Sequence, residues 1–170
     1  ALAGARDVIL ADEYCHMSIV EGMRLSYARK MRFRHNNPAS LAELLERCEP
    51  DAGRLVVIEG VYSMGGDLAD LGAITALCRR HGARLFLDDA HGLGVLGAGG
   101  RGTAESLGLA AETDIISGTF SKSFAGAGGF VAGEQAVVGY LRHFSVPFAF
   151  SASMPPASVA TARAALEIIR

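Results

Sequence analysis

The sequence contains few of the residues that mark several protein classes. It has no tryptophan and only three cysteines: Cys15, Cys48 and Cys78. Their odd number and lack of metal-type spacing argue against a disulfide framework or a metal site, so we expect reduced thiols, no metal and a cytoplasmic location. The net charge of -2 disfavours a nucleic-acid partner. No apolar run approaches a membrane span and no signal-peptide pattern is seen, so we expect no transmembrane segment.

Apolar residues and glycine, by contrast, are abundant. Half of the 170 residues are hydrophobic and 20% are charged, a composition typical of a globular domain with a sizeable core. The 21 glycines gather after strand-like runs instead of forming a linker. Glycine in such positions indicates turns that approach a ligand or another segment of backbone closely.

Short apolar runs alternate with helical patterns along the chain. The runs predict strands at 8–10, 31–33, 55–58, 84–87 and 114–117, and the helical patterns lie at 17–27, 41–48, 71–81, 134–144 and 157–170. Ser40 and Glu43 predict a capping box for the second helix, and Gly82 the C-cap of the third. Buried strands that alternate with helices predict an α/β fold with a mostly parallel central sheet and helices on both faces.

Polar residues follow three of these strands, in the ranges 59–63, 88–91 and 119–122. Because ligands of parallel sheets bind at the carboxyl ends of the strands, we expect one active-site edge. Lys122 lies between an apolar strand and a glycine-rich turn, where a lysine is costly unless its amine is held or used as a nucleophile. A strand-end lysine and a strand-end acid, Asp88, are what pyridoxal phosphate (PLP) requires, because the lysine forms a Schiff base and the acid keeps the ring nitrogen protonated.

Each residue alone is also consistent with an ordinary role. Lys122 fits a surface or ion-paired lysine, and the acid, the histidines and the hydroxyls fit caps or turn residues: Asp88, His91, His16, Ser63 and Thr119. Residues 92–97 match G-x-G-x-x-G, so a nucleotide-binding module is an alternative, although residues 98–102 do not resemble the start of a helix. Residues 118–123 lack the glycines of a Walker A loop.

The order of four motifs resembles the α-oxoamine synthases, PLP-dependent enzymes of fold type I. The motifs are Asp12-x-x-x-His16-x-Ser18, Glu59-Gly-Val-Tyr-Ser-Met-x-Gly-Asp67, Asp88-Asp-Ala-His91 with Gly-x-Gly-x-x-Gly and Gly100-Arg-Gly102, and Gly118-Thr-Phe-Ser-Lys122. They cover nearly the whole chain. Within the family, residues 15–16, 32–36, 62–64 and 150–156 most resemble the serine palmitoyltransferase branch. Residues 88–92 are more similar to the 8-amino-7-oxononanoate synthase branch.

The resemblance implies a role for each matching residue. Lys122 would bind the cofactor covalently and then act as a proton-transfer base, while Asp88 would pair with the pyridinium nitrogen. His16 would stack on the ring, and His91 would lie near its phenolic oxygen and orient the acyl group. Hydroxyl groups would make the remaining contacts to the ring or the phosphate: Ser63, Thr119, Ser121 and Ser151.

The family condenses an amino acid with an acyl-CoA and releases CO2. The resemblance therefore implies a PLP-dependent acyltransferase of sphingolipid biosynthesis that uses a small amino acid such as L-serine. It also implies a homodimer whose active site lies at the subunit interface, with the loop 150–156 reaching the partner. The alternatives are an 8-amino-7-oxononanoate synthase, an enzyme similar to glycine C-acetyltransferase, another fold-type I aminotransferase and a non-catalytic subunit.

Three residues depart from the pattern of the family. Ala125 stands where relatives often carry glycine, and Asp89 and Gly92 replace residues common in palmitoyltransferase-like members, so the acyl preference is unassigned. The sequence also begins after the family's phosphate loop and ends before the small domain that binds the substrate carboxylate. Residues 1–170 are therefore expected to be the central part of the PLP-binding large domain, with the N-terminal part and the small domain missing.

Overall fold

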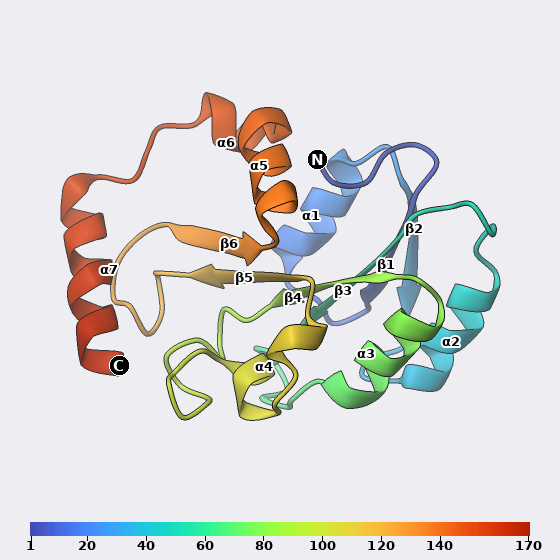
Figure 1. Cartoon of the computed structure of the whole chain (residues 1–170), viewed down its shortest axis with the longest axis horizontal. Coiled ribbons are helices and arrows are strands. Elements are labelled where there is room, and N and C mark those ends of the chain that lie inside the picture. Colours follow the sequence, from blue (N-terminus) through green and yellow to red (C-terminus); the bar gives the residue numbers. More distant parts are fainter.

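The computed structural model describes residues 1–170 and shows one twisted sheet between two layers of helices (Figure 1). The sheet has six strands in the order β2-β1-β3-β4-β5-β6. The strands are β1 Val8–Asp12, β2 Arg29–Phe33, β3 Arg54–Glu59, β4 Arg84–Asp88, β5 Ile115–Thr119 and β6 Gly129–Gly133. The first five pair in parallel, and β6 runs antiparallel to β5. The predicted α/β fold with a mostly parallel sheet is confirmed.

The helices lie on both sides of this sheet, as the sequence predicted. They are α1 Met17–Leu25, α2 Pro38–Glu46, α3 Leu71–Arg80, α4 Thr103–Ser106, α5 Gln135–Phe144, α6 Val146–Phe150 and α7 Pro156–Ile169, with a 3-10 turn at Ala110–Glu112. In Figure 1, α1 and α5 cover one face, and α2, α3 and α4 cover the other. The last helix, α7, lies beyond the ends of β5 and β6. No helix of the structure has the length and apolar character that crossing a membrane requires.

The alternation of side chains along the strands divides the core into two layers. Leu10, Val56 and Leu85 are fully buried and belong to the larger cluster, which includes side chains of α2 and α3. The intervening residues Ile9 and Val57 point to the other face and pack with Met23 of α1. Both faces of β1 and β3 are therefore covered, which explains their continuous apolar sequences.

Several local features differ from the predictions, among them the short helices α4 and α6, which were not predicted. The predicted capping box is wrong, because α2 begins at Pro38 and is capped by Asn37, whose side chain accepts a hydrogen bond from the amide of Ser40. Proline fits the first turn of a helix, where its missing N–H has no partner to lose. The strand β6 was not predicted, since a short run bounded by glycines has no clear period and forms through its pairing with β5.

Candidate active site

Three polar side chains stand side by side at the carboxyl edge of the sheet. The strand register pairs Glu59 of β3 with Asp88 of β4, and Asp88 with Ser117 of β5. In parallel strands, residues in register point to the same face, so the three side chains form a row. The row lies at the edge where ligands of α/β sheets bind.

Lys122 follows β5 in a tight turn of the backbone. The Thr119 hydroxyl is 2.7 Å from that of Ser121 and accepts a hydrogen bond from the Ser121 amide at 3.2 Å. The amide of Ala125 donates to the carbonyl of Lys122 at 2.9 Å, with Ala125 at a positive φ of 50°. Phe124 is buried behind this turn, while the Lys122 side chain is exposed. The turn thus presents the amine and two hydroxyls on one side.

The loop between β1 and α1 brings His16 to the same edge. His16 is the N-cap of α1, and its Nδ1 accepts a hydrogen bond from the amide of Ser18 at 3.2 Å. Its own amide donates to the buried carboxylate of Glu59. The imidazole is exposed and lines the cavity described below. Glu59 therefore links the site across β1 and β3.

The turn after β4 separates two adjacent acids. The Asp88 Oδ1 accepts a hydrogen bond from the amide of Ala90 at 3.1 Å, and its carboxylate lines the cavity. Asp89 points the other way, is fully buried and accepts hydrogen bonds of 2.6 Å from both the amide and the hydroxyl of Thr103. Asp89 anchors the turn, and this anchor holds Asp88 and His91 at the edge of the cavity.

These elements enclose a cavity of about 330 Å³. Its lining is almost entirely polar: His16, Ser18, Glu59, Asp88, Ala90, His91, Ser117, Gly118, Thr119, Ser121 and Lys122. Burial raises the pKa of Glu59, and the negative charge of Asp88 adds to this effect. Burial lowers the pKa of His91, and the positive charge of Lys122 lowers it further, which favours a neutral imidazole.

The structure brings six of the eight predicted site residues together in this cavity. They are His16, Asp88, His91, Thr119, Ser121 and Lys122. Ser63 is exposed in the turn after β3, and Ser151 is exposed just after α6; neither lines the cavity. The cavity is also lined by Ser18, Glu59 and Ser117, for which no role was predicted. The position of Glu59 and Ser117 at the ends of apolar runs was the feature of the sequence that could have identified them.

The G-x-G-x-x-G stretch serves the fold of this loop. A Cβ on Gly92 would lie 2.2 Å from Asp89 Oδ1, so glycine leaves room for the buried carboxylate. The amide of Gly94 donates to the carbonyl of Gly100, which folds the loop back on itself before α4. The loop therefore does not lead from its strand directly into a helix, as a dinucleotide-binding turn does.

Comparison with known proteins assigns the chain to a family. The model of the aminotransferase class I and II family matches residues 1–170. The chain belongs to this family. Among its relatives, serine palmitoyltransferase from Bacteroides ovatus is 45% identical over 170 residues. The 8-amino-7-oxononanoate synthase from Geobacter sulfurreducens is 47% identical over 169 residues. Both relatives are α-oxoamine synthases, so the resemblance read from the motifs is confirmed.

Solved structures of this aminotransferase family agree with the fold. The serine palmitoyltransferase of Sphingomonas wittichii superposes with a TM-score of 0.96 at 43% identity over 99% of this chain. A variant of the S. paucimobilis enzyme with bound PLP–myriocin superposes equally well, at 39% identity. The chain spans only 43% of the length of the B. ovatus and G. sulfurreducens relatives and 42% of the S. wittichii structure.

The residues in the cavity of this aminotransferase family member fit PLP. Lys122 supplies a primary amine, Asp88 an acid for the ring nitrogen, and His16 an exposed imidazole on the side of α1. The hydroxyls of Thr119 and Ser121 line the same cavity and are groups suited to a phosphate. The cavity thus offers an amine, a carboxylate and hydroxyls, which are groups suited to the aldehyde, the ring nitrogen and the phosphate of PLP.

Proposed function

We propose that the protein containing this chain is a PLP-dependent α-oxoamine synthase that condenses L-serine with an acyl-CoA and releases CO2. The observation that carries the proposal is that Lys122, Asp88, His16 and His91 line one cavity. This arrangement occurs in a chain whose relatives include serine palmitoyltransferases at 45% identity. Residues 1–170 would form the central part of the PLP-binding large domain.

Each side chain has a task that follows from its place. When bound, PLP supplies an electron-poor ring that stabilises negative charge on the substrate Cα. Lys122 holds the cofactor and moves the proton at the substrate Cα, because its amine is exposed in the cavity. Asp88, oriented by the amide of Ala90, holds the proton on the ring nitrogen through a charge-assisted hydrogen bond.

The two histidines confine the ligands from different elements. His16, fixed as the cap of α1, lines the cavity and would pack against the ring of bound PLP and exclude water from it. His91 follows β4, and burial lowers its pKa, so its neutral imidazole both donates and accepts hydrogen bonds at the ring oxygen and the acyl group. Thr119 and Ser121 would bind the phosphate, and Ser63 and Ser151 are proposed to join the site through contacts outside this cavity.

Reductive trapping tests the cofactor and the lysine together. The chain has only two lysines, Lys122 and Lys30, and the latter is exposed on β2 and donates to the carbonyl of Ser26. After borohydride treatment of the full-length protein with PLP, we expect a pyridoxyl adduct on Lys122 by mass spectrometry. Lys122→Ala removes the adduct and the turnover, whereas Lys30→Arg retains both. Normal turnover of Lys122→Ala rules out the mechanism.

A substrate screen separates the reaction from its alternatives. L-serine, glycine and L-alanine are each combined with acyl-CoAs of different length, and free CoA thiol is measured. Release of CoA with serine supports the serine palmitoyltransferase-like reaction, and release with alanine supports the reaction of the 8-amino-7-oxononanoate synthases. Transfer of the amino group to a keto acid without CoA release identifies an aminotransferase instead. The relatives of both branches make the first two outcomes the principal candidates.

We also propose a homodimer with the active site at the subunit interface. Large apolar side chains of the C-terminal helices remain exposed: Tyr140, Phe144, Val146, Phe148, Phe150 and Ile168. An apolar surface of this kind is typical of a protein interface. Sedimentation of the full-length protein tests this proposal.

The cellular location that we propose is the cytoplasm. Three free buried cysteines fit this location, where thiols stay reduced.

A further inference from the structure

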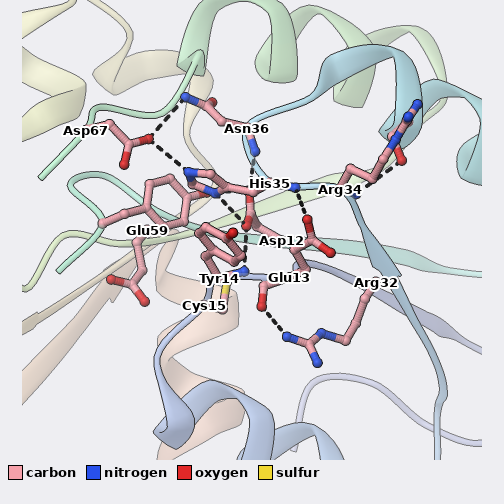
Figure 2. A network of polar contacts seen from close by, with 12 residues as sticks. Asp12, Glu13, Tyr14, Cys15, Arg32, Arg34, His35, Asn36, Glu59 and Asp67 are labelled. Atoms are coloured by element: carbon pink, nitrogen blue, oxygen red, sulfur yellow. Dashed lines mark hydrogen bonds and ion pairs between the residues drawn. The ribbon is translucent and has the colours of Figure 1, made fainter. Parts of the chain in front are cut away.

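A polar network outside the cavity surrounds His35 (Figure 2). The imidazole lies between two carboxylates, with Nδ1 3.0 Å from Asp12 Oδ1 and Nε2 3.0 Å from Asp67 Oδ2. Its ring stacks on Tyr14 at a centroid distance of 4.2 Å and meets the edge of Tyr62 at 4.5 Å. The histidine is thereby fixed in position and orientation from four sides.

The network joins three segments that are distant in sequence. Asp12 ends β1 and is fully buried, and its carboxylate also accepts hydrogen bonds from the amides of Tyr14 and Asn36 and from the hydroxyl of Tyr62. Asp67 lies in the turn after β3, where its carbonyl accepts a hydrogen bond from the amide of Tyr62. His35, which follows β2, is the side chain that contacts both carboxylates.

The electrostatics favour an imidazolium at this place. Burial, the largest single influence, lowers the pKa of His35, but the hydrogen bonds and negative charges of Asp12 and Asp67 outweigh it and raise the pKa. Because both ring nitrogens face carboxylates, both act as donors only when the ring is protonated. The ring then forms a charged bridge between the loop after β1 and the turn after β3.

The loop that this bridge holds leads directly to His16. Only three residues separate Asp12 from His16, and the second of them, Tyr14, is held by the Asp12 carboxylate and by the His35 ring. At its other end, the amide of His16 donates to Glu59. The loop is thus fixed at both ends, one by the bridge and one by a carboxylate of the cavity.

We propose that His35 is a positioning residue for His16: by bridging Asp12 and Asp67, it fixes the loop 12–16 and sets the His16 ring in the cofactor cavity. The proposal rests on the proposed function, in which the cavity holds PLP. His35 does not line the cavity and acts only through the loop. A small displacement of a group that contacts the cofactor weakens binding and catalysis strongly, even when the change lies outside the site.

The test compares His35→Gln with a matched structural variant in the full-length protein. The control is Asp114→Asn. The carboxylate of Asp114 also accepts two hydrogen bonds, from Arg84 at 2.7 Å and from the amide of Leu85 at 2.8 Å, but it lies at the opposite edge of the sheet from the cavity. Binding of PLP to the cofactor-free protein is followed by visible absorbance, and the fixed orientation of the ring by visible circular dichroism. We expect His35→Gln to bind PLP about tenfold more weakly, with a smaller dichroic signal for each bound PLP. Asp114→Asn should retain the PLP affinity and the dichroic signal of the parent protein.

A double-mutant cycle separates positioning from general loss of stability. In a His16→Ala background, His35→Gln should weaken PLP binding little further, because the group that His35 positions is absent. Asp67→Asn keeps the ring of His35 but removes one of its two charged partners. We therefore expect it to weaken PLP binding in the same direction as His35→Gln, but by less. The proposal is overturned if His35→Gln binds PLP with the affinity and the dichroic signal of the parent protein. It is also overturned if His35→Gln weakens PLP binding as much in the His16→Ala background as it does in the parent protein. If the parent protein itself binds no PLP, the proposed function fails instead.

Discussion

The substitution Thr103→Val tests whether Asp89 anchors the turn that carries Asp88 and His91. The carboxylate of Asp89 is fully buried and accepts hydrogen bonds of 2.6 Å from the amide and the hydroxyl of Thr103. Valine has nearly the shape of threonine, so the change removes one of these two donors with little effect on packing. A hydrogen bond to a charged group contributes about 1.5–3 kcal/mol, so we expect the free energy of unfolding to fall by about 2 kcal/mol.

The loss of unfolding free energy caused by Thr103→Val should grow as the pH rises. Burial raises the pKa of Asp89 above the ordinary value of 3.8, and the hydrogen bonds from Thr103 oppose this rise. Without the hydroxyl, the pKa of Asp89 in the folded protein rises further. A carboxyl whose folded pKa is raised contributes stability that is present below the unfolded pKa and is lost as the pH rises through the folded pKa. The loss caused by Thr103→Val is therefore larger near pH ~7 than near pH ~4.

Urea denaturation at the two pH values measures this difference. Thr161→Val is the matched control, because the Thr161 hydroxyl donates to the carbonyl of Ala157 at 2.9 Å on the exposed surface of α7. The control should change the free energy of unfolding by less than about 0.5 kcal/mol at either pH. An equal loss at both pH values, or a loss no larger than that of the control, refutes the assignment of Asp89 as a charged buried anchor.

Three further predictions concern His91, which follows β4, Gly102, which lies against Asp89, and Gly139 in α5. Burial lowers the pKa of His91 below 6.5. In the cofactor-free protein, the contribution of His91 to stability is therefore present above pH 6.5 and is lost as the pH falls through the lower, folded-state pKa. His91→Asn should remove this part of the pH dependence of the free energy of unfolding, measured by denaturation. Gly102→Ala should destabilise the protein by about 3 kcal/mol, because the residue has a φ of 94° and its Cβ would lie 2.0 Å from Asp89 Oδ2. Gly139→Ala, in α5 with no atom near the new Cβ, should instead stabilise it by up to about 1 kcal/mol in the same measurement.

Strand ends gave the most reliable signal in the sequence. The run before Asp88 is apolar because Leu85 and Leu87 are buried in the core and Phe86 is half-buried. In the run before Lys122, Ile115 is buried and Ile116 half-buried, and both runs turn polar at the carboxyl ends of their strands. Six predicted site residues consequently meet in one cavity. Helix boundaries were less predictable. Ser40 satisfies a capping pattern but lies inside α2, where its hydroxyl accepts a hydrogen bond from the amide of Arg34.

The sequence by itself determined the parallel α/β fold, the edge that carries the chemistry and the resemblance to α-oxoamine synthases. These features depend on the local alternation of apolar and polar residues and on the order of motifs, both of which are present in the linear chain. Only the tertiary structure showed what the neighbouring Asp89 does: its carboxylate is fully buried and bound to Thr103, a residue 14 positions away, whereas the predicted acid Asp88 lines the cavity. It also brought His35 between Asp12 and Asp67, residues 23 and 32 positions away, because such a charged bridge forms only where β1, β2 and β3 end side by side.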